Sequence, residues 1–195
     1  LADPYWPKKA MEGHPEDIVP CLRCSNCYHI SSDHWNVGCS VNPRYHHQEF
    51  VPSEINLPKA ETKKHVVILG GGPAGMKAAI TASDRGHKVT IIEKQKELGG
   101  MLRFISKEAH KEEVQRLLDY YLTQIFKREI EVLLNTEADP ELVKELQPDS
   151  LLIAFGAVER ILPIPGVEGE KVQLATKAIA HPEQLGQNIV ILGGG

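Results

Sequence analysis

Residues 65–75 read His-Val-Val-Ile-Leu-Gly-Gly-Gly-Pro-Ala-Gly, and this stretch decides the fold class. The β-branched and aliphatic run at 66–69 predicts a central strand of a parallel sheet, covered on both faces. In the turn that follows, Gly70 permits a tight bend and Gly72 lets backbone amides approach a diphosphate. Gly75 allows the next helix to pack closely on the strand. The stretch therefore predicts a strand, a turn and a helix that bind a dinucleotide.

The residues after this turn strengthen the prediction. Pro73 and Ala74 are expected at the start of a helix that ends before Gly86, because proline is tolerated in the first helical turn. A second strand at 88–92 then delivers Glu93 to its carboxyl end. A carboxylate there accepts hydrogen bonds from a ribose and repels a 2'-phosphate, which favours FAD or NAD over NADP. An ordinary glycine-rich turn is the alternative interpretation, and the surrounding elements argue against it.

Hydrophobic spacing predicts the remaining elements. They are a helix at 112–129, a strand at 131–135, a short helix at 139–146 and a buried strand at 151–155. Asp139 is expected to cap the short helix, and Gly156 to end the last strand. Alternating strands and helices predict an α/β fold with a Rossmann-like, doubly wound parallel sheet.

All four cysteines of the chain precede this region, at Cys21, Cys24, Cys27 and Cys39. Three close thiolates and one distant thiolate suit the irons of a 4Fe-4S cluster. A structural zinc site more often takes its cysteines from two separated Cys-x-x-Cys pairs, and disulfides would require a secreted domain. The spacing therefore favours a cluster and leaves zinc and disulfides as alternatives. A redox centre beside a nucleotide site predicts electron transfer.

Composition argues against two classes of partner. Lys and Arg total 22 against 26 Asp and Glu, with a net charge of −4, so no basic surface for nucleic acid is expected. No apolar run approaches the roughly 20 residues that span a bilayer, and residues 1–4 do not resemble a signal sequence. The sequence predicts a cytoplasmic protein that binds neither nucleic acid nor membrane.

The chain divides near residue 58, where two prolines and a charged run separate a Cys-, His- and Pro-rich segment from the periodic region. The run at 189–195 repeats the pattern of 66–72, which predicts a strand at 188–192 and the start of a second nucleotide-binding unit. We therefore expect a cluster-binding segment at 1–58, a dinucleotide-binding domain at 59–187 and the start of another at 188–195. Leu1 and the terminal glycines are expected for an internal piece of a longer protein.

Several motifs together carry a resemblance to a known family. They are Cys21-Leu22-Arg23-Cys24-Ser25-Asn26-Cys27, Cys39-Ser40-Val41-Asn42-Pro43, residues 70–75, Glu93-Lys94 and Leu98-Gly99-Gly100. The chain resembles the iron-sulfur flavoenzyme branch of the old yellow enzyme family, which includes 2,4-dienoyl-CoA reductase, enoate reductases and trimethylamine dehydrogenase. The resemblance implies an FMN-binding (β/α)8 barrel upstream, then a 4Fe-4S loop. An FAD- or ADP-binding domain follows, interrupted by an NAD(P)H-binding domain.

The resemblance also implies roles for individual residues. The metal ligands would be Cys21, Cys24, Cys27 and Cys39, and the FAD-binding residues would be Gly70, Gly72, Pro73, Ala74, Gly75, Glu93, Lys94, Gly100 and Gly156. The family likeness, and not the spacing, selects FAD over NAD for this site. Related sequences carry Ala-Thr-Gly where this chain has Ala154-Phe155-Gly156, so a threonine contact is missing. Gly193 and Gly195 would open the NAD(P)H site.

The activity implied for the intact enzyme is hydride transfer from NAD(P)H to FAD, passage of single electrons through the cluster, and delivery to FMN. FMN would then reduce an activated carbon–carbon double bond of an enoate or a dienoyl-CoA. Contacts with this small-molecule substrate would lie in the missing barrel, so no catalytic residue is expected in the 195 residues. By themselves they should bind FAD weakly and not turn over substrate.

Two other functions stay open. One is an amine dehydrogenase of the trimethylamine type, with ADP in the nucleotide site. The other is a non-catalytic module that binds zinc through the four cysteines. The sequence does not decide whether the protein forms a homo-oligomer.

Overall fold

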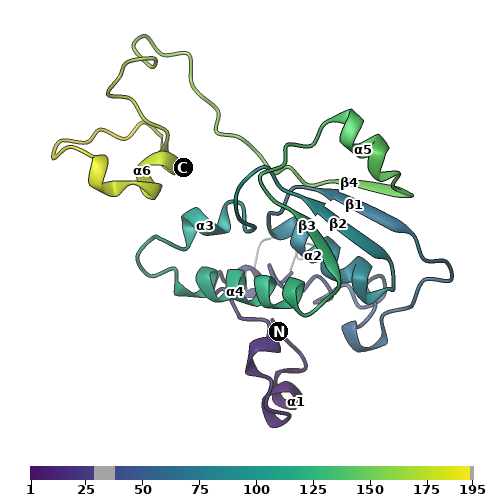
Figure 1. Cartoon of the computed structure of the whole chain (residues 1–195). Coiled ribbons are helices and arrows are strands. Elements are labelled where there is room, and N and C mark those ends of the chain that lie inside the picture. The colour runs from purple at the N-terminus through teal and green to yellow at the C-terminus, as the bar shows by residue number, and fades with distance from the viewer. Residues whose placement is uncertain (29–37, 194–195) are drawn as a thin grey trace.

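The computed structural model describes residues 1–28 and 38–193 of the chain. Within these residues the centre is a four-stranded parallel sheet in the order β3-β2-β1-β4 (Figure 1). The strands are β1 (His65–Leu69), β2 (Lys88–Ile92), β3 (Ile130–Leu133) and β4 (Ser150–Ile153). This order is that of a doubly wound nucleotide-binding half, so the predicted Rossmann-like α/β fold is confirmed.

Helices cover the sheet unequally. They are α1 (Trp6–Met11), α2 (Pro73–Asp84), α3 (Leu102–Ile105), α4 (Glu112–Phe126), α5 (Pro140–Leu146) and α6 (Ala175–Ala180). Helices α2 and α4 pack on one face, whereas the short α5 lies on the other (Figure 1). Helix α6 belongs to a C-terminal arm that approaches α3 (Figure 1). No helix in the described ranges is both long and apolar enough to cross a bilayer.

Strand β1 is buried over Val67–Leu69, as its apolar sequence predicts. Ile68 faces the core formed with α2 and α4, and Val67 faces the smaller core under α5. Both side chains are fully buried. Alternation along the strand thus sends successive side chains into two different cores.

The predicted helix ends are largely confirmed. Asp139 caps α5, since its Oδ1 accepts a hydrogen bond from the amide of Leu142 at 2.8 Å. Helix α4 ends at Phe126 rather than at 129, because the chain must turn before β3 begins at Ile130. Neither α3 nor α6 was predicted, because helices of one or two turns carry little periodic signal.

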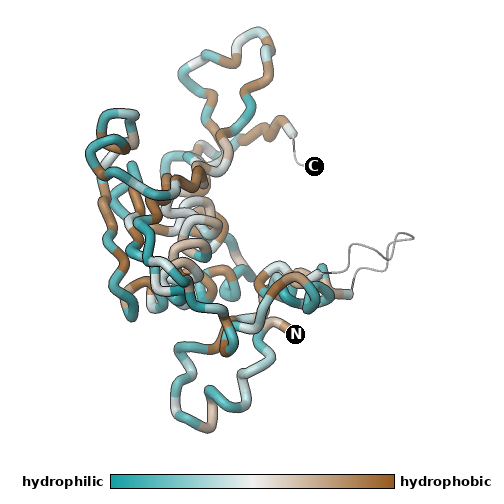
Figure 2. The backbone as a smooth tube through the Cα atoms, turned by 90° about the vertical axis from the view of Figure 1, so that its right-hand side faces the viewer, coloured by the Kyte–Doolittle hydropathy of each residue, from teal (hydrophilic) through white to brown (hydrophobic). Residues whose placement is uncertain are grey.

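Two expectations are wrong in the C-terminal part. The strand predicted as buried at 151–155 forms as β4, but its side chains are exposed because it lies at the edge of the described sheet and pairs only with β1. The predicted strand at 188–192 does not form. Its side chains are exposed, and the apolar segment leading to the C-terminus stands apart from the sheet (Figure 2).

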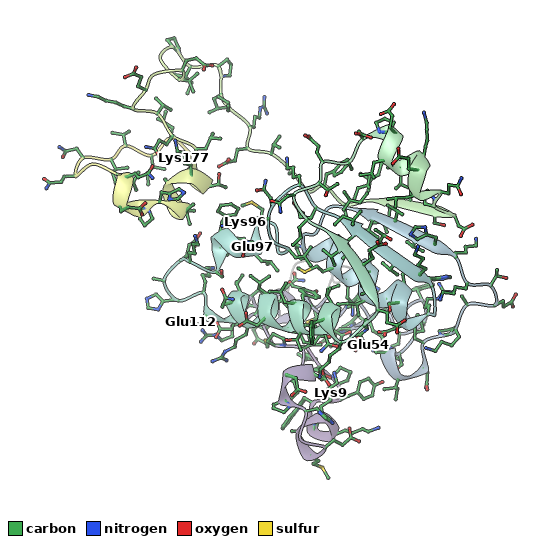
Figure 3. All side chains as sticks on the ribbon, in the orientation of Figure 1. Lys9, Glu54, Lys96, Glu97, Glu112 and Lys177 are labelled. Carbon is green, nitrogen blue, oxygen red and sulfur yellow. The ribbon has the colours of Figure 1, made fainter. Side chains whose placement is uncertain are left out.

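The N-terminal segment packs on the nucleotide-binding unit. Val19 and Val41 are buried in the same core as Met76 of α2 and Leu118 of α4. Lys9, labelled in Figure 3, donates to Asp3 at 2.6 Å and closes α1 onto this segment. The residues around the cysteines are therefore positioned by the helices that cover the sheet.

Candidate functional site

The predicted nucleotide-binding residues meet at the carboxyl edge of the sheet. The amide of Gly70 donates to Ile92 O at 2.8 Å, and the amide of Ala154 donates to Leu69 O at 2.8 Å. The ends of β1, β2 and β4 are thus held side by side. Open α/β sheets bind ligands in the crevice outside this edge.

Close backbone approach requires glycine at two positions of the turn. Gly70 has φ +107°, and a Cβ there would overlap the carbonyl group of Ala154. A Cβ on Gly75 would overlap the carbonyl oxygen of Gly70. Only glycines allow the turn to pass between two strands and the first turn of α2.

Gly72 has a different role from its neighbours. It is the N-cap of α2, no side chain caps the helix, and a Cβ on Gly72 would meet nothing within 4 Å. Pro73 occupies the first turn and Ala74 is exposed. The first amides of a 12-residue helix therefore face open space with the positive end of the helix dipole, an arrangement that binds a diphosphate.

Glu93 is buried and held by two backbone amides. Its Oε2 accepts from Gly71 at 2.7 Å, and its Oε1 accepts from Gln95 at 2.8 Å. These bonds fix the carboxylate at the end of β2, beside the glycine turn. A carboxylate there can accept hydrogen bonds from ribose hydroxyls, as predicted. Lys94, the next residue, is exposed at the rim.

The structure adds three residues that the sequence prediction did not assign to the site: Gly71, Leu98 and Gly99. The amide of Gly99 donates to Gly71 O at 2.8 Å, and a Cβ on Gly71 would overlap the Leu98 side chain. Gly100, which was predicted, comes so close that its Cβ would lie 3.0 Å from Gly72 Cα. The loop before α3 therefore closes over the glycine turn. The run of three glycines was the signal that could have revealed this.

An ion pair also holds the loop that precedes α3. Glu97, labelled beside Lys96 in Figure 3, forms an ion pair with Arg103 of α3. This bond lowers the pKa of Glu97. Gly156 lies beyond the end of β4, and the Phe155 side chain before it is exposed.

The cysteine loop has an unusual backbone. Arg23 and Ser25, the residues on either side of Cys24, adopt φ of 51° and 58°. Left-handed conformations at residues other than glycine cost energy and concentrate at functional sites. A backbone that alternates between right- and left-handed conformations points successive amide N–H groups toward one side. Many iron-sulfur and phosphate sites use such groups of amides to bind negative charge.

The Cys24 thiol has a hydrogen-bond partner among the described residues of its own segment. The Cys24 Sγ lies 3.2 Å from Ser40 Oγ, and this hydrogen bond lowers the pKa of the Cys24 thiol. All four cysteines are free thiols, so the disulfide alternative is not what the structure contains. A thiolate is the form that binds metal.

The spacing of the sulfurs bears on the choice of metal. Zinc holds four sulfurs about 3.8 Å apart, given a Zn–S distance of about 2.3 Å, whereas each thiolate of a cubane cluster binds a different iron and lies further from the others. Among the described residues, which include all four cysteines, no three sulfurs lie within 4.8 Å of one another. Four cysteine thiols are a donor set that a 4Fe-4S cluster accepts, and in this structure their sulfurs are not gathered at the spacing of a zinc site.

A third group of ligand-type side chains has a simpler explanation. His14, Glu16 and Asp17 lie close enough to share an ion. Lys127, however, donates to Glu16 at 2.8 Å and to Asp17 at 2.7 Å. The ammonium group already supplies the positive charge, so this cluster attaches the N-terminal segment to the end of α4.

The cysteine loop is also tied to α4. Arg23 Nη2 lies 2.6 Å from Glu113 in the first turn of α4, and the bond lowers the pKa of Glu113. Helix α4 thus contacts the cysteine loop at its N-terminal end and packs on α2, the helix that begins at the glycine turn. One element positions both candidate sites.

Comparison with known proteins agrees with this geometry. Residues 64–195 match the pyridine nucleotide-disulphide oxidoreductase family. Over its whole length the chain is 38% identical to an NADH oxidase of Thermoanaerobacter brockii and 36% identical to a cinnamate reductase of Clostridium sporogenes. It covers 30% and 29% of these two proteins, so it spans less than a third of their length.

Solved structures give the same result. A 2-naphthoyl-CoA reductase is 36% identical with a TM-score of 0.87, over 95% of this chain and 28% of that one. A histamine dehydrogenase of a Rhizobium species is 28% identical with a TM-score of 0.77, over 84% of this chain and 24% of that one. The reductase is therefore more similar to this chain than the dehydrogenase in both sequence and structure.

Proposed function

Since the chain belongs to the pyridine nucleotide-disulphide oxidoreductase family, in the iron-sulfur flavoenzyme branch with enoate and dienoyl reductases, we propose that it is part of an NAD(P)H-dependent flavoprotein oxidoreductase. Its cofactors would be FAD in the crevice at the sheet edge and a 4Fe-4S cluster on the four cysteines. The intact protein would pass electrons from NAD(P)H through FAD and the cluster to FMN, and so reduce an activated carbon–carbon double bond. Similarity to a cinnamate reductase and a 2-naphthoyl-CoA reductase supports a conjugated acid or thioester as substrate.

The observation that carries the proposal is that α4 contacts both candidate sites. It is bonded to the cysteine loop and packs on α2, the helix that begins at the glycine turn. The glycine turn and the unblocked start of α2 would hold the diphosphate, and Glu93 would accept hydrogen bonds from the ribose. Ser40 stabilises the Cys24 thiolate, and the Arg23–Glu113 bond orients the loop that carries it. When bound, flavin exchanges electrons in pairs or singly and a 4Fe-4S cluster exchanges them singly.

The test is an anaerobic measurement of iron, acid-labile sulfide and flavin in the full-length protein. We expect about four irons and four sulfides per chain, with both FAD and FMN released on denaturation. Zinc without iron or sulfide would contradict the cluster and support the non-catalytic zinc module instead.

Matched variants locate each cofactor. Cys24→Ser should lower the iron content, whereas Ser40→Ala removes only a hydrogen bond to the sulfur and should retain iron. Glu93→Gln should weaken FAD binding at least tenfold, because a charge-assisted hydrogen bond contributes about 1.5–3 kcal/mol. Glu129→Gln, at an exposed position after α4, is the control. Unchanged FAD affinity in Glu93→Gln would place the nucleotide elsewhere.

The amine dehydrogenase remains the second candidate because of the similarity to histamine dehydrogenase. In that case the crevice would hold ADP, and electrons would leave to a carrier protein. Chromatography of the released cofactors separates the two proposals: FAD with FMN supports the reductase, and ADP with a single flavin supports the dehydrogenase.

A further inference from the structure

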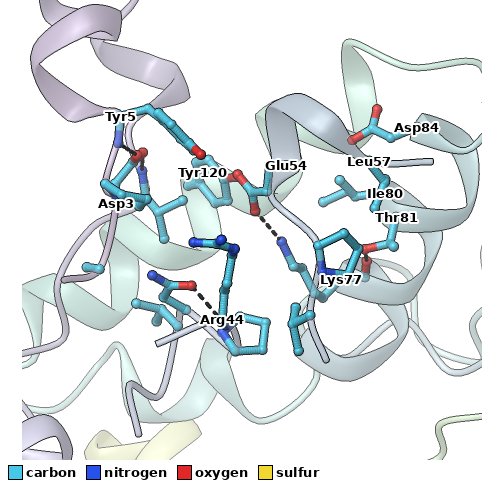
Figure 4. Close-up of a pocket in the computed structure, with 18 of the residues that line it drawn as sticks. Asp3, Tyr5, Arg44, Glu54, Leu57, Lys77, Ile80, Thr81, Asp84 and Tyr120 are labelled. Carbon is cyan, nitrogen blue, oxygen red and sulfur yellow. Dashed lines mark hydrogen bonds and ion pairs between the residues drawn. The ribbon is translucent and has the colours of Figure 1, made fainter. Parts of the chain in front are cut away.

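A second cavity lies away from the sheet edge. It has a volume of about 470 Å³ and is lined by the N-terminal segment, α2 and α4 (Figure 4). Small-molecule sites in proteins usually have volumes of 300–1,000 Å³. The nucleotide-binding residues do not line this cavity, so the proposed function leaves it without a role.

Arg44 is the residue of the cavity lining whose side-chain polar atoms lack partners. Its side chain reaches from one edge of the cavity toward Tyr120 and Glu54 (Figure 4). Its Nε is buried and has no hydrogen-bond partner. Among the described residues, no ion pair reaches its guanidinium group, and the hydrogen bonds of Arg44 are made by its backbone, whose amide donates to Asn42 Oδ1 at 3.0 Å and whose carbonyl accepts from the His47 amide at 2.9 Å. A buried donor without a partner is costly and requires an explanation.

The acidic side chains around the cavity already have partners, and Arg85, a second guanidinium in the lining, donates from Nε to Pro58 O at 3.2 Å. Lys77 pairs with Glu54 at 2.8 Å, and Arg128 pairs with Asp84 at 2.7 Å. Asp3 pairs with Lys9. Since these acids have partners, Arg44 is left as an unmatched positive charge facing the cavity.

The rest of the lining supplies a neutral donor and apolar walls. Burial, and to a lesser degree the charge of Glu54, raises the pKa of Tyr120, so its phenol stays protonated and can donate a hydrogen bond. The walls include Val19, Val41 and Ile80 together with four prolines. An inorganic anion would leave most of this apolar surface uncovered.

We propose that this cavity binds a small organic carboxylate with an apolar body, and that Arg44 is its anion anchor. A guanidinium group can donate two parallel hydrogen bonds to a carboxylate, which would satisfy the buried Nε. Tyr120 in the lining would supply a second donor, and the valine, isoleucine and proline side chains would cover the apolar part.

The probe for this site is 4-phenylbutyrate, compared with its neutral amide, in calorimetric titrations of the 195-residue chain. We expect the acid to bind with a Kd of about 1 mM or below and the amide to bind at least tenfold more weakly. Arg44→Gln should weaken binding of the acid at least tenfold. Arg160→Gln removes an exposed guanidinium group outside the cavity lining and should change nothing.

Three results would overturn the proposal: equal affinity for acid and amide, full affinity in Arg44→Gln, or no binding by the unaltered chain up to about 10 mM. If Arg44→Gln fails to fold by circular dichroism, the comparison of acid with amide on the unaltered chain decides. Neither readout depends on FAD or the cluster, so failure here would leave the proposed function standing.

Discussion

Two segments of this chain have nearly the same sequence, and their described parts, 66–72 and 189–193, differ in structure. Residues 66–72 read Val-Val-Ile-Leu-Gly-Gly-Gly, and residues 189–195 read Ile-Val-Ile-Leu-Gly-Gly-Gly. In the first, Ile68 is 0% exposed at the centre of a sheet, whereas its counterpart Ile191 is 80% exposed in a segment that forms no strand. The comparison teaches that an apolar run followed by glycines specifies a strand only where neighbouring strands are present to receive it.

The physical reason is that a strand does not satisfy its own backbone. Strand β1 bonds to β2 on one side and to β4 on the other, and helices cover both of its faces. Among the described residues, no strand lies beside 189–192. Without such partners, backbone hydrogen bonds go to water and the apolar side chains stay exposed.

Amide hydrogen exchange gives the largest expected difference. Amides of residues 67–69 should be protected roughly 10⁴-fold or more, because they open only with the whole sheet. Amides of 189–192 should exchange at nearly the unprotected rate. Strong protection of both segments would show that the second also forms a strand, and the comparison would be broken.

Truncation of the matching isoleucines should give the next largest effect. Ile68→Ala should lower the free energy of unfolding by about 4 kcal/mol, because it leaves a cavity in the main core. Ile191→Ala should change it by less than about 0.5 kcal/mol. Urea denaturation of both variants measures the difference, and equal losses would contradict the structure.

The first glycines of the two runs form another matched pair. Gly70→Ala should cost about 3 kcal/mol, since it adds an overlap with Ala154 to a backbone of φ +107°. Gly193 has a similar φ of +99° but open surroundings, so Gly193→Ala should have little effect on global unfolding. The same measurements apply, and tolerance of alanine at Gly70 would mean that the turn is looser than described.

A small, pH-dependent effect on stability is expected from Asp17, which accepts hydrogen bonds from Gln124 of α4 and from Lys127 just after this helix. Burial raises the pKa of Asp17, but hydrogen bonds from Lys127 and Gln124 outweigh burial and lower it. A carboxyl group with a lowered folded pKa adds stability that is complete above its ordinary value of 3.8 and is lost as the pH falls through the folded pKa.

Asp17→Asn should therefore lower the free energy of unfolding by about 0.5 kcal/mol at neutral pH, with no difference from the unaltered chain in strong acid. Thermal denaturation across pH measures this, with Glu137→Gln at an exposed position as the control. A difference that persists unchanged at low pH would show that Asp17 acts by packing rather than by charge.

The sequence predicted most of the nucleotide site because that site is local. Gly70, Gly72, Gly75 and Glu93 each occupy a place that one strand–turn–helix unit and the next strand define. Gly71 and Leu98 belong to quoted motifs but were not assigned to the site, because their contact joins two loops that are distant in the chain and periodicity carries no information about which loops meet. The ligand roles of the four cysteines stay predictions.

By itself, then, the sequence determined the type and order of the central elements, the glycine turn and the acid that follows β2, since these depend on side-chain period and backbone freedom within short windows. Tertiary structure alone decided which strands pair with β1, how α4 joins the cysteine loop to the sheet, and that Arg44 faces a cavity. Those outcomes depend on which surfaces meet, and burial and hydrogen-bond satisfaction exist only after distant segments have come together.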